Sequence, residues 1–193
     1  MAHIGMKYVV AAPLTEANGA ASWANGFVVA KAIEFSGTPN SSDVELWADD
    51  GIAETEKGIQ NMETSLNVDD LSLKVQSDLL GHTYTAASTT SGNETPEGIV
   101  IKETDVAPFV GMGFYKRRKK NGVVTYTVIW LNKVQHTRPA EAAATKGDTV
   151  EFQTDTIEGK AYPLSSGEIY EKHIFTTEAA AKDWLDDKAG ISA

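Results

Sequence analysis

Few residues of this sequence have the type and spacing that catalysis or metal binding requires. A zinc-type site needs ligands at short, regular spacing, whereas each histidine stands alone, without another histidine or a clustered carboxylate at that spacing. The four are His3, His82, His136 and His173. The Gly-Met-Gly motif at 111–113 lacks the Gly-Lys-Ser/Thr continuation of a phosphate-binding loop and leads into a predicted strand rather than a helix. No serine lies in a Gly-x-Ser-x-Gly nucleophile motif. We therefore expect no enzyme, no cofactor and no metal.

Composition narrows the class of protein further. The chain has 193 residues, enough for one domain with its own core. It has no cysteine, which excludes disulfides, thiolate metal sites and cysteine nucleophiles. The formal net charge of -10 argues against a surface that binds DNA as a whole. The N-terminus lacks the basic start of a signal peptide, and no apolar run approaches the roughly 20 residues that span a bilayer.

Charge is distributed unevenly along the chain. Residues 116–120, Lys-Arg-Arg-Lys-Lys, hold 5 of the 17 Lys and Arg, whereas the stretch 43–56 contains six carboxylates and no cation. Two unlike patches on one molecule can form a heterologous contact between copies, which closes into rings or continues into filaments. A solvated loop is the alternative for 43–56, and a nucleic-acid or membrane contact is the alternative for 116–120. The predicted subunit interface comprises Asp43, Glu45, Trp47, Asp49, Asp50, Glu54, Glu56, Lys116, Arg117, Arg118, Lys119 and Lys120.

Short strands separated by turn signals make up most of the chain, which favours a mainly β (α+β) fold, an antiparallel β-sandwich or barrel. The predicted strands are 6–12, 27–36, 43–48, 57–67, 83–90, 97–103, 108–120, 123–135, 148–161 and 168–175. Two amphipathic helices, at about 69–80 and 177–189, flank the sheet. Asp69 is expected to cap the first helix and Thr176 or Thr177 the second, with Gly81 and Gly190 at their C-terminal ends.

The dipeptide Asn121-Gly122 predicts a hairpin with a two-residue type I′ turn. This turn places Lys120 opposite Val123 and Phe114 opposite Ile129. The outer parts of both strands are apolar, whereas the segment 116–125 is not. We therefore expect the tip, with its cations, to project past the sheet.

Two strands carry a hydrophilic row on alternate positions. The row in 57–67 is Ile59, Asn61, Glu63, Ser65 and Asn67, and the row in 148–161 begins with Glu151, Gln153 and Asp155. Alternation of this kind is typical of a solvated sheet face. Because both rows lack cations until the strand ends, a smooth and weakly acidic wall is the more specific interpretation.

Several stretches, in the same order, resemble the major tail protein, or tail tube protein, of siphovirus-type phages that infect Gram-positive bacteria. They cover most of the chain: GMKYVVAAPL (5–14), DVELWADDGIAETEKG (43–58), LNVDDLSLKVQSDLLGH (66–82), DVAPFVGMGFYKRRKKNGVVTYTVIWLNKVQ (105–135), TKGDTVEFQTDTIEGKAY (145–162) and FTTEAAAKDWLDDKAG (175–190).

The resemblance implies a structural protein without catalysis, made in the host cytoplasm and built into the virion. Copies form rings, with six expected per ring, and the rings stack into a tail tube through which DNA passes in transit. Its partners would be itself, the tape measure protein, the tail terminator and the distal tail or baseplate proteins, with no membrane. The expected layout is one tail tube domain, 1–193, with an N-terminal arm at about 1–26 and loops at about 37–57 and 86–97 as extensions.

On this interpretation the two hydrophilic rows line the lumen, since acidic and amide side chains repel phosphate or let it slide past. The predicted lumen residues are Asn61, Glu63, Ser65, Asn67, Glu151, Gln153 and Asp155. The tube protein of a phage-tail-like bacteriocin remains an alternative. A different class is a nucleic-acid-binding β module in which Phe114, Tyr115 and Tyr126 stack on bases beside the cations. A ligand-binding β-sandwich or an enzyme is a third, without a readable site.

Overall fold

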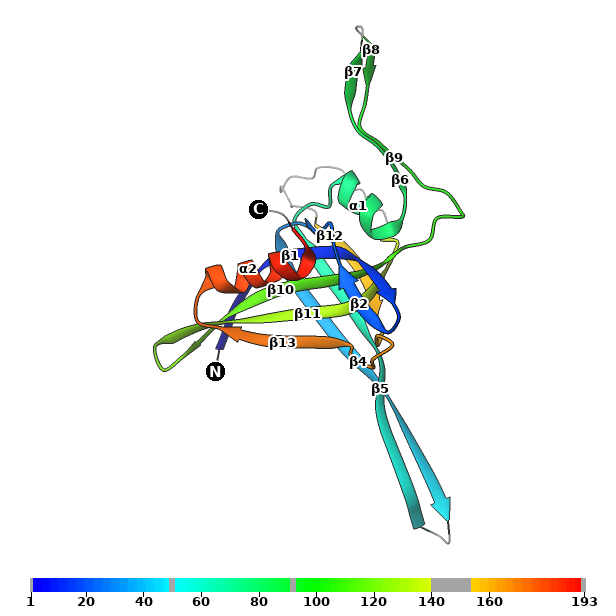
Figure 1. Cartoon of the computed structure of the whole chain (residues 1–193), viewed down its shortest axis with the longest axis vertical. Coiled ribbons are helices and arrows are strands. Elements are labelled where there is room, and N and C mark those ends of the chain that lie inside the picture. The colour runs from blue at the N-terminus through cyan, green and yellow to red at the C-terminus, as the bar shows by residue number, and fades with distance from the viewer. Residues whose placement is uncertain (1, 49–50, 91–92, 140–153, 192–193) are drawn as a thin grey trace, which may run out of the picture.

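Strand pairing dominates the computed structural model of the chain, which describes residues 2–48, 51–90, 93–139 and 154–191 (Figure 1). Side chains are described for these residues except 2–4, 43–48, 51–57, 90 and 93. The fold is mainly β, with one large antiparallel sheet and two helices, as the alternating pattern predicted.

The large sheet has the strand order β2-β1-β10-β11-β12-β5-β4. In addition β3 pairs with β1, and β13 pairs with the first half of β11 while β12 pairs with its end. The strands of this sheet are β1 (Ala2–Ala17), β2 (Ala20–Trp23), β3 (Phe27–Val28), β4 (Ala32–Ala48), β5 (Gly51–Val68), β10 (Phe109–Lys120), β11 (Val123–Thr137), β12 (Asp155–Ala161) and β13 (Tyr170–Phe175). Two small pairs lie outside it, β6 (Thr83–Thr85) with β9 (Gly98–Val100) and β7 (Ser88–Thr90) with β8 (Asn93–Thr95).

The β10–β11 hairpin has the predicted turn and register. Asn121 and Gly122 both have positive φ, 50° and 82°, as a type I′ turn requires. Lys120 lies opposite Val123, and Phe114 lies opposite Ile129. One part of the prediction was wrong. The cationic part of β10 does not pair with β11 alone, because the segment of β1 from Ala2 to Met6 pairs with its other edge. The turn itself still extends past the end of β13 (Figure 1).

Both helices end where glycine was expected, but the first begins later. Gly81 and Gly190 are left-handed C-caps with φ of 75° and 65°. α2 (Glu178–Ala189) is capped by Thr177, one of the two predicted residues. α1 (Leu73–Leu80) is capped by Ser72, whose hydroxyl accepts from the Val75 N–H. Asp69 is therefore not the cap, since its carboxylate accepts from the Lys31 N–H at 3.0 Å and ties the chain before β4 to the end of β5.

Two apolar clusters hold the sheet and helices together. The larger lies between β1, β10 and β11 on one side and β5, β12 and α1 on the other, with Phe114, Leu131, Leu66 and Ile157 almost fully buried. The smaller lies on the opposite face of β1, β10 and β11, where α2 packs. β10 and β11 are therefore covered on both faces, and they form the centre of the molecule.

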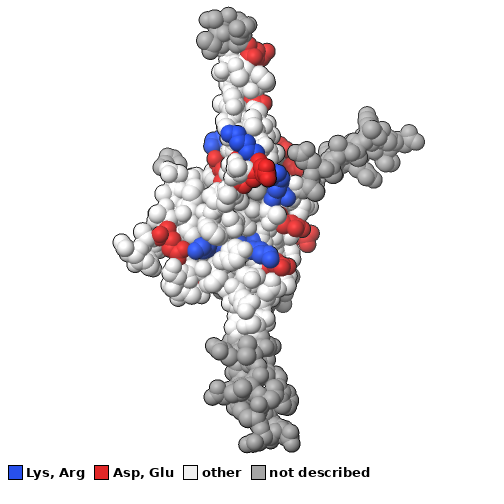
Figure 2. Space-filling model, turned by 90° about the vertical axis from the view of Figure 1, so that its right-hand side faces the viewer, with Lys and Arg blue, Asp and Glu red and all other residues white. Residues whose placement is uncertain are grey.

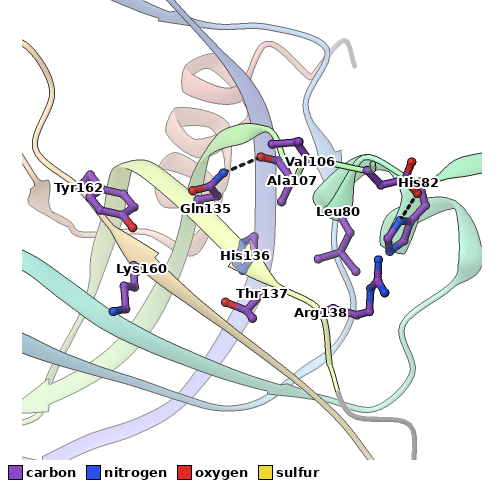
Figure 3. A pocket seen from close by; sticks show the side chains of 11 residues that line it. Leu80, His82, Val106, Ala107, Gln135, His136, Thr137, Arg138, Lys160 and Tyr162 are labelled. Carbon is purple, nitrogen blue, oxygen red and sulfur yellow. Dashed lines mark hydrogen bonds and ion pairs between the residues drawn. The ribbon is translucent and has the colours of Figure 1, made fainter. Parts of the chain in front are cut away.

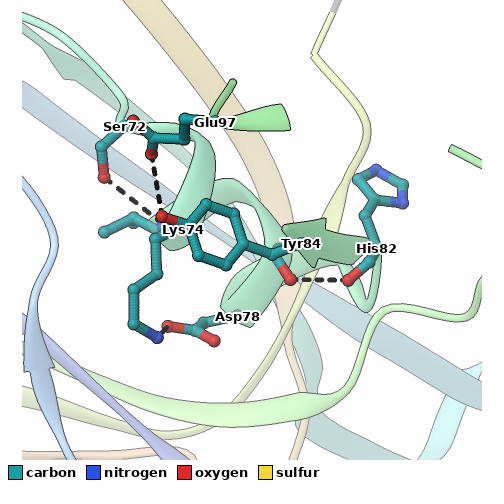
Figure 4. Close-up of polar contacts among 8 residues, drawn as sticks. Ser72, Lys74, Asp78, His82, Tyr84 and Glu97 are labelled. Atoms are coloured by element: carbon teal, nitrogen blue, oxygen red, sulfur yellow. Dashed lines mark hydrogen bonds and ion pairs between the residues drawn. The ribbon is translucent and has the colours of Figure 1, made fainter. Parts of the chain in front are cut away.

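Polar contacts stabilise α1 and the small β6–β9 pair that follows it in the chain (Figure 4). Tyr84 of β6 donates to Glu97 at 3.0 Å, and the Ser77 hydroxyl donates to the His82 carbonyl just beyond the helix. On the helix itself Lys74 pairs with Asp78 at 2.9 Å. The β7–β8 pair stands farther out, at the top of the view in Figure 1.

Three expected extensions turn out to contain strands. The predicted arm at 1–26 contains β1, which pairs with β10 inside the large sheet. The predicted loop at 37–57 belongs to β4 and β5, which pair from Ala32 to Ala48 and project together as a long ribbon (Figure 1). The predicted loop at 86–97 contains β7 and β8. The predicted strands 6–12 and 43–48 lie inside β1 and β4, and the correction concerns the turn-rich stretch 37–42, where pairing with β5 outweighs the local turn signals.

Because Gly113 has no side chain, α2 and the ring of Trp130 pack closely against β10 at this position. Substitution of Gly113 should therefore lower the stability of the fold. A Cβ at Gly113 would lie 2.4 Å from the Trp130 ring and 2.6 Å from Leu185. We expect Gly113→Ala to lower the free energy of unfolding by about 1–3 kcal/mol, measured by urea denaturation. Gly98→Ala is the control, because its Cβ would meet nothing within 4 Å. Equal stability of the two variants would contradict this account.

Glu16 connects three distant segments, and its contribution should depend on pH. Its carboxylate accepts from Lys133 at 2.7 Å and from the Ser165 N–H at 2.7 Å. These contacts, with Lys133 the largest, lower the pKa of Glu16 to about 2. A lowered folded-state pKa means that the stabilisation is present above the ordinary glutamate pKa of about 4.5 and is lost as pH falls toward 2. We expect Glu16→Gln to flatten the dependence of stability on pH between these values in acid titrations followed by circular dichroism.

Candidate subunit-contact and lumen-lining surfaces

A continuous hydrophilic face covers the outer side of β4, β5 and β12. Strand register places its members on one side of the sheet, because residues directly opposite each other in an antiparallel pair share a face. The alternate residues of β5, Met62, Thr64 and Leu66, are buried on the other side. We call this surface the hydrophilic face; it consists of Glu34, Ser36, Thr38, Asn40, Asn61, Glu63, Ser65, Asn67, Thr156, Glu158 and Lys160.

Amide and hydroxyl groups on the hydrophilic face bond to one another across the strands. Asn40 donates to Asn61 at 3.0 Å, and Asn67 donates to Thr156 at 3.1 Å. Lys160 lies 3.8 Å from Glu63, so the one cation of the face has an acidic neighbour. A shallow hollow of about 350 Å³ lies where β4, β5 and β12 meet the end of β11, and Glu63, Glu158 and Lys160 are among its lining residues. With three carboxylates and one ammonium group, the face is weakly acidic.

The structure places only part of the predicted lumen set on this face. Asn61, Glu63, Ser65 and Asn67 form a row along β5, as their alternation predicted. Asp155 does not belong to that row, because it lies opposite Val68, whose side chain is buried in the core. Its carboxylate accepts from the Leu71 N–H at 2.8 Å and so anchors the segment before α1. Glu151 and Gln153 lie outside the described residues.

Sequence reasoning missed the residues that take the place of Asp155. In β12 the odd-numbered Ile157 and Ala161 are buried, so the outward positions are Thr156, Glu158 and Lys160. The signal was present, since the apolar side chains of Ile157 and Ala161 break the odd-numbered polar row. The β4 members Glu34, Ser36, Thr38 and Asn40 also alternate visibly in the sequence EFSGTPN.

The cationic run is divided between two faces of the sheet. Lys116, Arg118 and Lys120 continue the face of Phe114, whereas Arg117 and Lys119 continue the face of Tyr115 that α2 covers farther along. The Lys116 ammonium lies 5.6 Å from the centre of the Phe114 ring. Partial burial, and to a smaller extent Lys172, lowers the pKa of Lys116. Lys172 of β13 is thus a further cation near the run, one that sequence spacing did not indicate.

The acidic half of the predicted interface lies on the projecting ribbon. Asp43, Glu45 and Trp47 are on β4, and Glu54 and Glu56 are on β5, although their side chains lie outside the described ones. Asp49 and Asp50 lie outside the described residues. The ribbon and the β10–β11 turn extend in different directions from the core (Figure 1). Contact between the two segments therefore needs a second copy of the chain.

Charge on the body of the molecule is mixed where it can be seen. Figure 2, which views the right-hand side of Figure 1, shows Lys and Arg interspersed with Asp and Glu around the centre. The base of the projecting ribbon is uncharged in the same view, in agreement with its sequence from Thr38 to Ser42. No extended single-sign patch occupies this side of the described surface.

Other possible sites contribute little chemistry. Gly111 and Gly113 serve packing, because a Cβ on either would clash with Trp130. Among the residues that the structure describes, no three His, Cys, Asp or Glu side chains gather as a metal ion would require. Within the same residues, no helix has the length and apolar character needed to cross a membrane.

No protein-family model matches this chain, and no curated protein sequence matches it.

Asp155 and Glu158 provide a test of the face assignment. We expect Asp155→Ala to lower the free energy of unfolding by about 1 kcal/mol, because it removes the acceptor of the Leu71 N–H. Glu158→Gln is the matched variant on the outward side of the same strand, and its stability should change by less than about 0.5 kcal/mol. Thermal and urea unfolding of both proteins would measure the difference. If Glu158→Gln lowered the stability more than Asp155→Ala, the assignment of Asp155 to the inner side of β12 would be wrong.

Proposed function

We propose that this chain is a self-assembling structural protein whose copies form stacked rings and thereby a tube, as in the tail of a siphovirus-type phage. The observation that carries the proposal is the β4–β5 ribbon. Its pairing continues from the core to Ala48 and Gly51, yet among its described side chains none beyond Met62 belongs to either apolar cluster. From Asn40 to Ala48 it reaches roughly 30 Å, at about 3.3 Å per residue.

A two-stranded ribbon without a core is marginally stable in water. Such a ribbon gains stability when it lies against another protein surface, and assembly into rings or stacks provides one. The division of charge supports the same interpretation, because acidic residues on the ribbon strands and cations near the β10–β11 turn are too far apart to meet within one molecule. Contact between copies through these unlike surfaces is heterologous, which closes into rings or propagates.

The hydrophilic face suits the wall of a channel for DNA. Its amides, hydroxyls and carboxylates offer phosphate groups little attraction, and its one cation is near Glu63. Electrostatic repulsion from such a wall extends about 8–10 Å at ordinary salt, which is relevant inside a narrow tube. On this proposal DNA only passes through, and the lumen side is the face of β4, β5 and β12.

Partners and location follow from the proposal. The tube would contact the tape measure protein inside, a tail terminator at one end and distal tail or baseplate proteins at the other, and it would reside in the virion after synthesis in the bacterial cytoplasm. A phage-tail-like bacteriocin would use the same kind of subunit. The proposed subunit contacts and the proposed lumen face are the same for a phage tail and for such a bacteriocin.

A nucleic-acid-binding module is less well supported by the side chains of the hairpin. Stacking on bases needs exposed aromatic rings, whereas Phe114 and Tyr115 are almost fully buried. The Tyr115 hydroxyl donates to Glu178 of α2 at 2.7 Å, and burial together with this bond raises the pKa of Tyr115. Only the cations and the partly buried Tyr126 would remain for binding.

The proposed assembly can be tested by charge reversal in the cationic run. Electron microscopy of the concentrated protein should reveal rings or tubes. Replacement of all five residues 116–120 by Glu should leave dispersed, folded protein, since each contact would become repulsive and many contacts would add together. Reversal of the acids on the ribbon in the same protein should partly restore assembly.

A smaller pair of variants supplies the control. Arg117→Glu with Lys119→Glu changes two exposed cations of the run, and Lys74→Glu with Lys102→Glu changes the net charge equally on another part of the surface. Only the first pair should raise the protein concentration needed for assembly. Equal behaviour of the two pairs would remove the run from the interface, and a protein that stays monomeric under all conditions and occurs in no tail would overturn the proposed function.

A further inference from the structure

A second cavity, of about 340 Å³, lies where the end of β11 passes the loop at 105–107 and the end of α1 (Figure 3). Polar side chains from several segments line it, among them His82, Asp105, His136, Arg138, Lys160 and Tyr162. It has no part in the surfaces proposed for assembly, apart from Lys160, which borders both. Most of these polar side chains are hydrogen-bond donors, and Asp105 is the carboxylate among them.

His82 is the most informative residue of the cavity. Its side chain is 3% exposed, and Nδ1 lies 2.9 Å from the Asp105 carboxylate. Asp105 also accepts from the Lys102 N–H at 2.8 Å, and these two bonds, the one from Lys102 first, lower the pKa of Asp105. An ionised Asp105 requires the proton of His82 on Nδ1. The opposite nitrogen, Nε2, is buried and has no hydrogen-bond partner among the described residues.

Arg138 lies next to this unpartnered nitrogen. Figure 3 shows the guanidinium group of Arg138 directed at the imidazole ring of His82. A guanidinium group has only donors, and a histidine with both nitrogens protonated also has only donors. The two groups can therefore share one acceptor, and an oxygen atom with negative charge fits between them in both chemistry and charge.

His136 also lines the cavity. It is 4% exposed, and neither ring nitrogen has a hydrogen-bond partner in the described part of the chain. Burial lowers the pKa of His136 to about 4; the Glu158 carbonyl opposes this weakly, and the geometry of that contact falls short of a hydrogen bond. His136 is therefore neutral near pH 7 and adds no charge to the cavity. Lys160 and Tyr162 border the cavity at the other end (Figure 3).

We propose that this cavity binds an oxyanion, held mainly by Arg138 and by His82 protonated on Nε2. The charges balance, because the anion neutralises Arg138 and Asp105 neutralises the imidazolium of His82. A phosphate group and a carboxylate share this chemistry, and in a chain of net charge -10 a site lined by two cations is a local exception. The inference does not depend on the proposed function.

Isothermal titration calorimetry of the full chain with sulfate and with acetate tests the site. Sulfate stands in for a phosphate group and does not itself titrate near neutral pH, and acetate stands in for a carboxylate side chain. We expect binding of at least one of them. The anion that binds more tightly identifies the type of natural ligand.

Arg138→Gln is the decisive variant, because Arg138 is exposed and its replacement should leave the fold intact. Loss of a charged donor should weaken binding about tenfold or more. Lys74→Gln is the control, since it removes one cation of α1 that does not line the cavity. A general effect of salt on the protein, as opposed to binding in the cavity, would be the same in Arg138→Gln, in Lys74→Gln and in the unaltered chain. No binding of either anion, or equal affinity in Arg138→Gln and the unaltered chain, would overturn the proposal.

Discussion

The close packing of Trp130 against the backbone of β10 determines where the other elements can lie. Its ring occupies the space that side chains at 111 and 113 would take, and both positions are glycine. Trp23 meets the same ring edge-on, with centroids 5.6 Å apart, and donates its indole N–H to the Asn132 carbonyl. Leu185 of α2 packs over Gly113, beside the Trp130 ring. One large aromatic side chain thus positions β2, β10 and α2 together.

With the centre of the sheet covered on both faces, the outer strands β4, β5 and β12 supply the broad hydrophilic surface. β11 makes this possible because its first half pairs with β13 and its end pairs with β12. The same end of β11 contributes residues to both hollows, on the hydrophilic face and beside α1. The hydrophilic face and the cavity beside α1 therefore lie next to each other, and Thr137 and Lys160 line both hollows.

Sequence patterns predicted the elements best where a local rule determines geometry. Asn121-Gly122 predicted the β10–β11 register, and Gly81 and Gly190 predicted the helix ends. The failures occurred where pairing partners decide. The stretch SGTPNSSD is rich in turn formers, yet it forms a strand because Gly37 to Asp43 pair with β5, and Pro39 is tolerated on an edge strand. Only the β5 row of the hydrophilic face was predicted, and the β12 members were missed because a shift of one position in a strand exchanges its two sides.

The continuity of β4 and β5 from the ribbon into the sheet has a mechanical consequence. Backbone hydrogen bonds in an antiparallel pair run perpendicular to the strands, so a pull along the ribbon loads them in shear. The load passes into β12 over the whole length from Val68 opposite Asp155 to Met62 opposite Ala161, and many bonds share it at once. A sideways force meets no such reinforcement beyond Pro39 and Met62, where contact with the apolar core ends. The ribbon is therefore stiff along its axis and compliant across it.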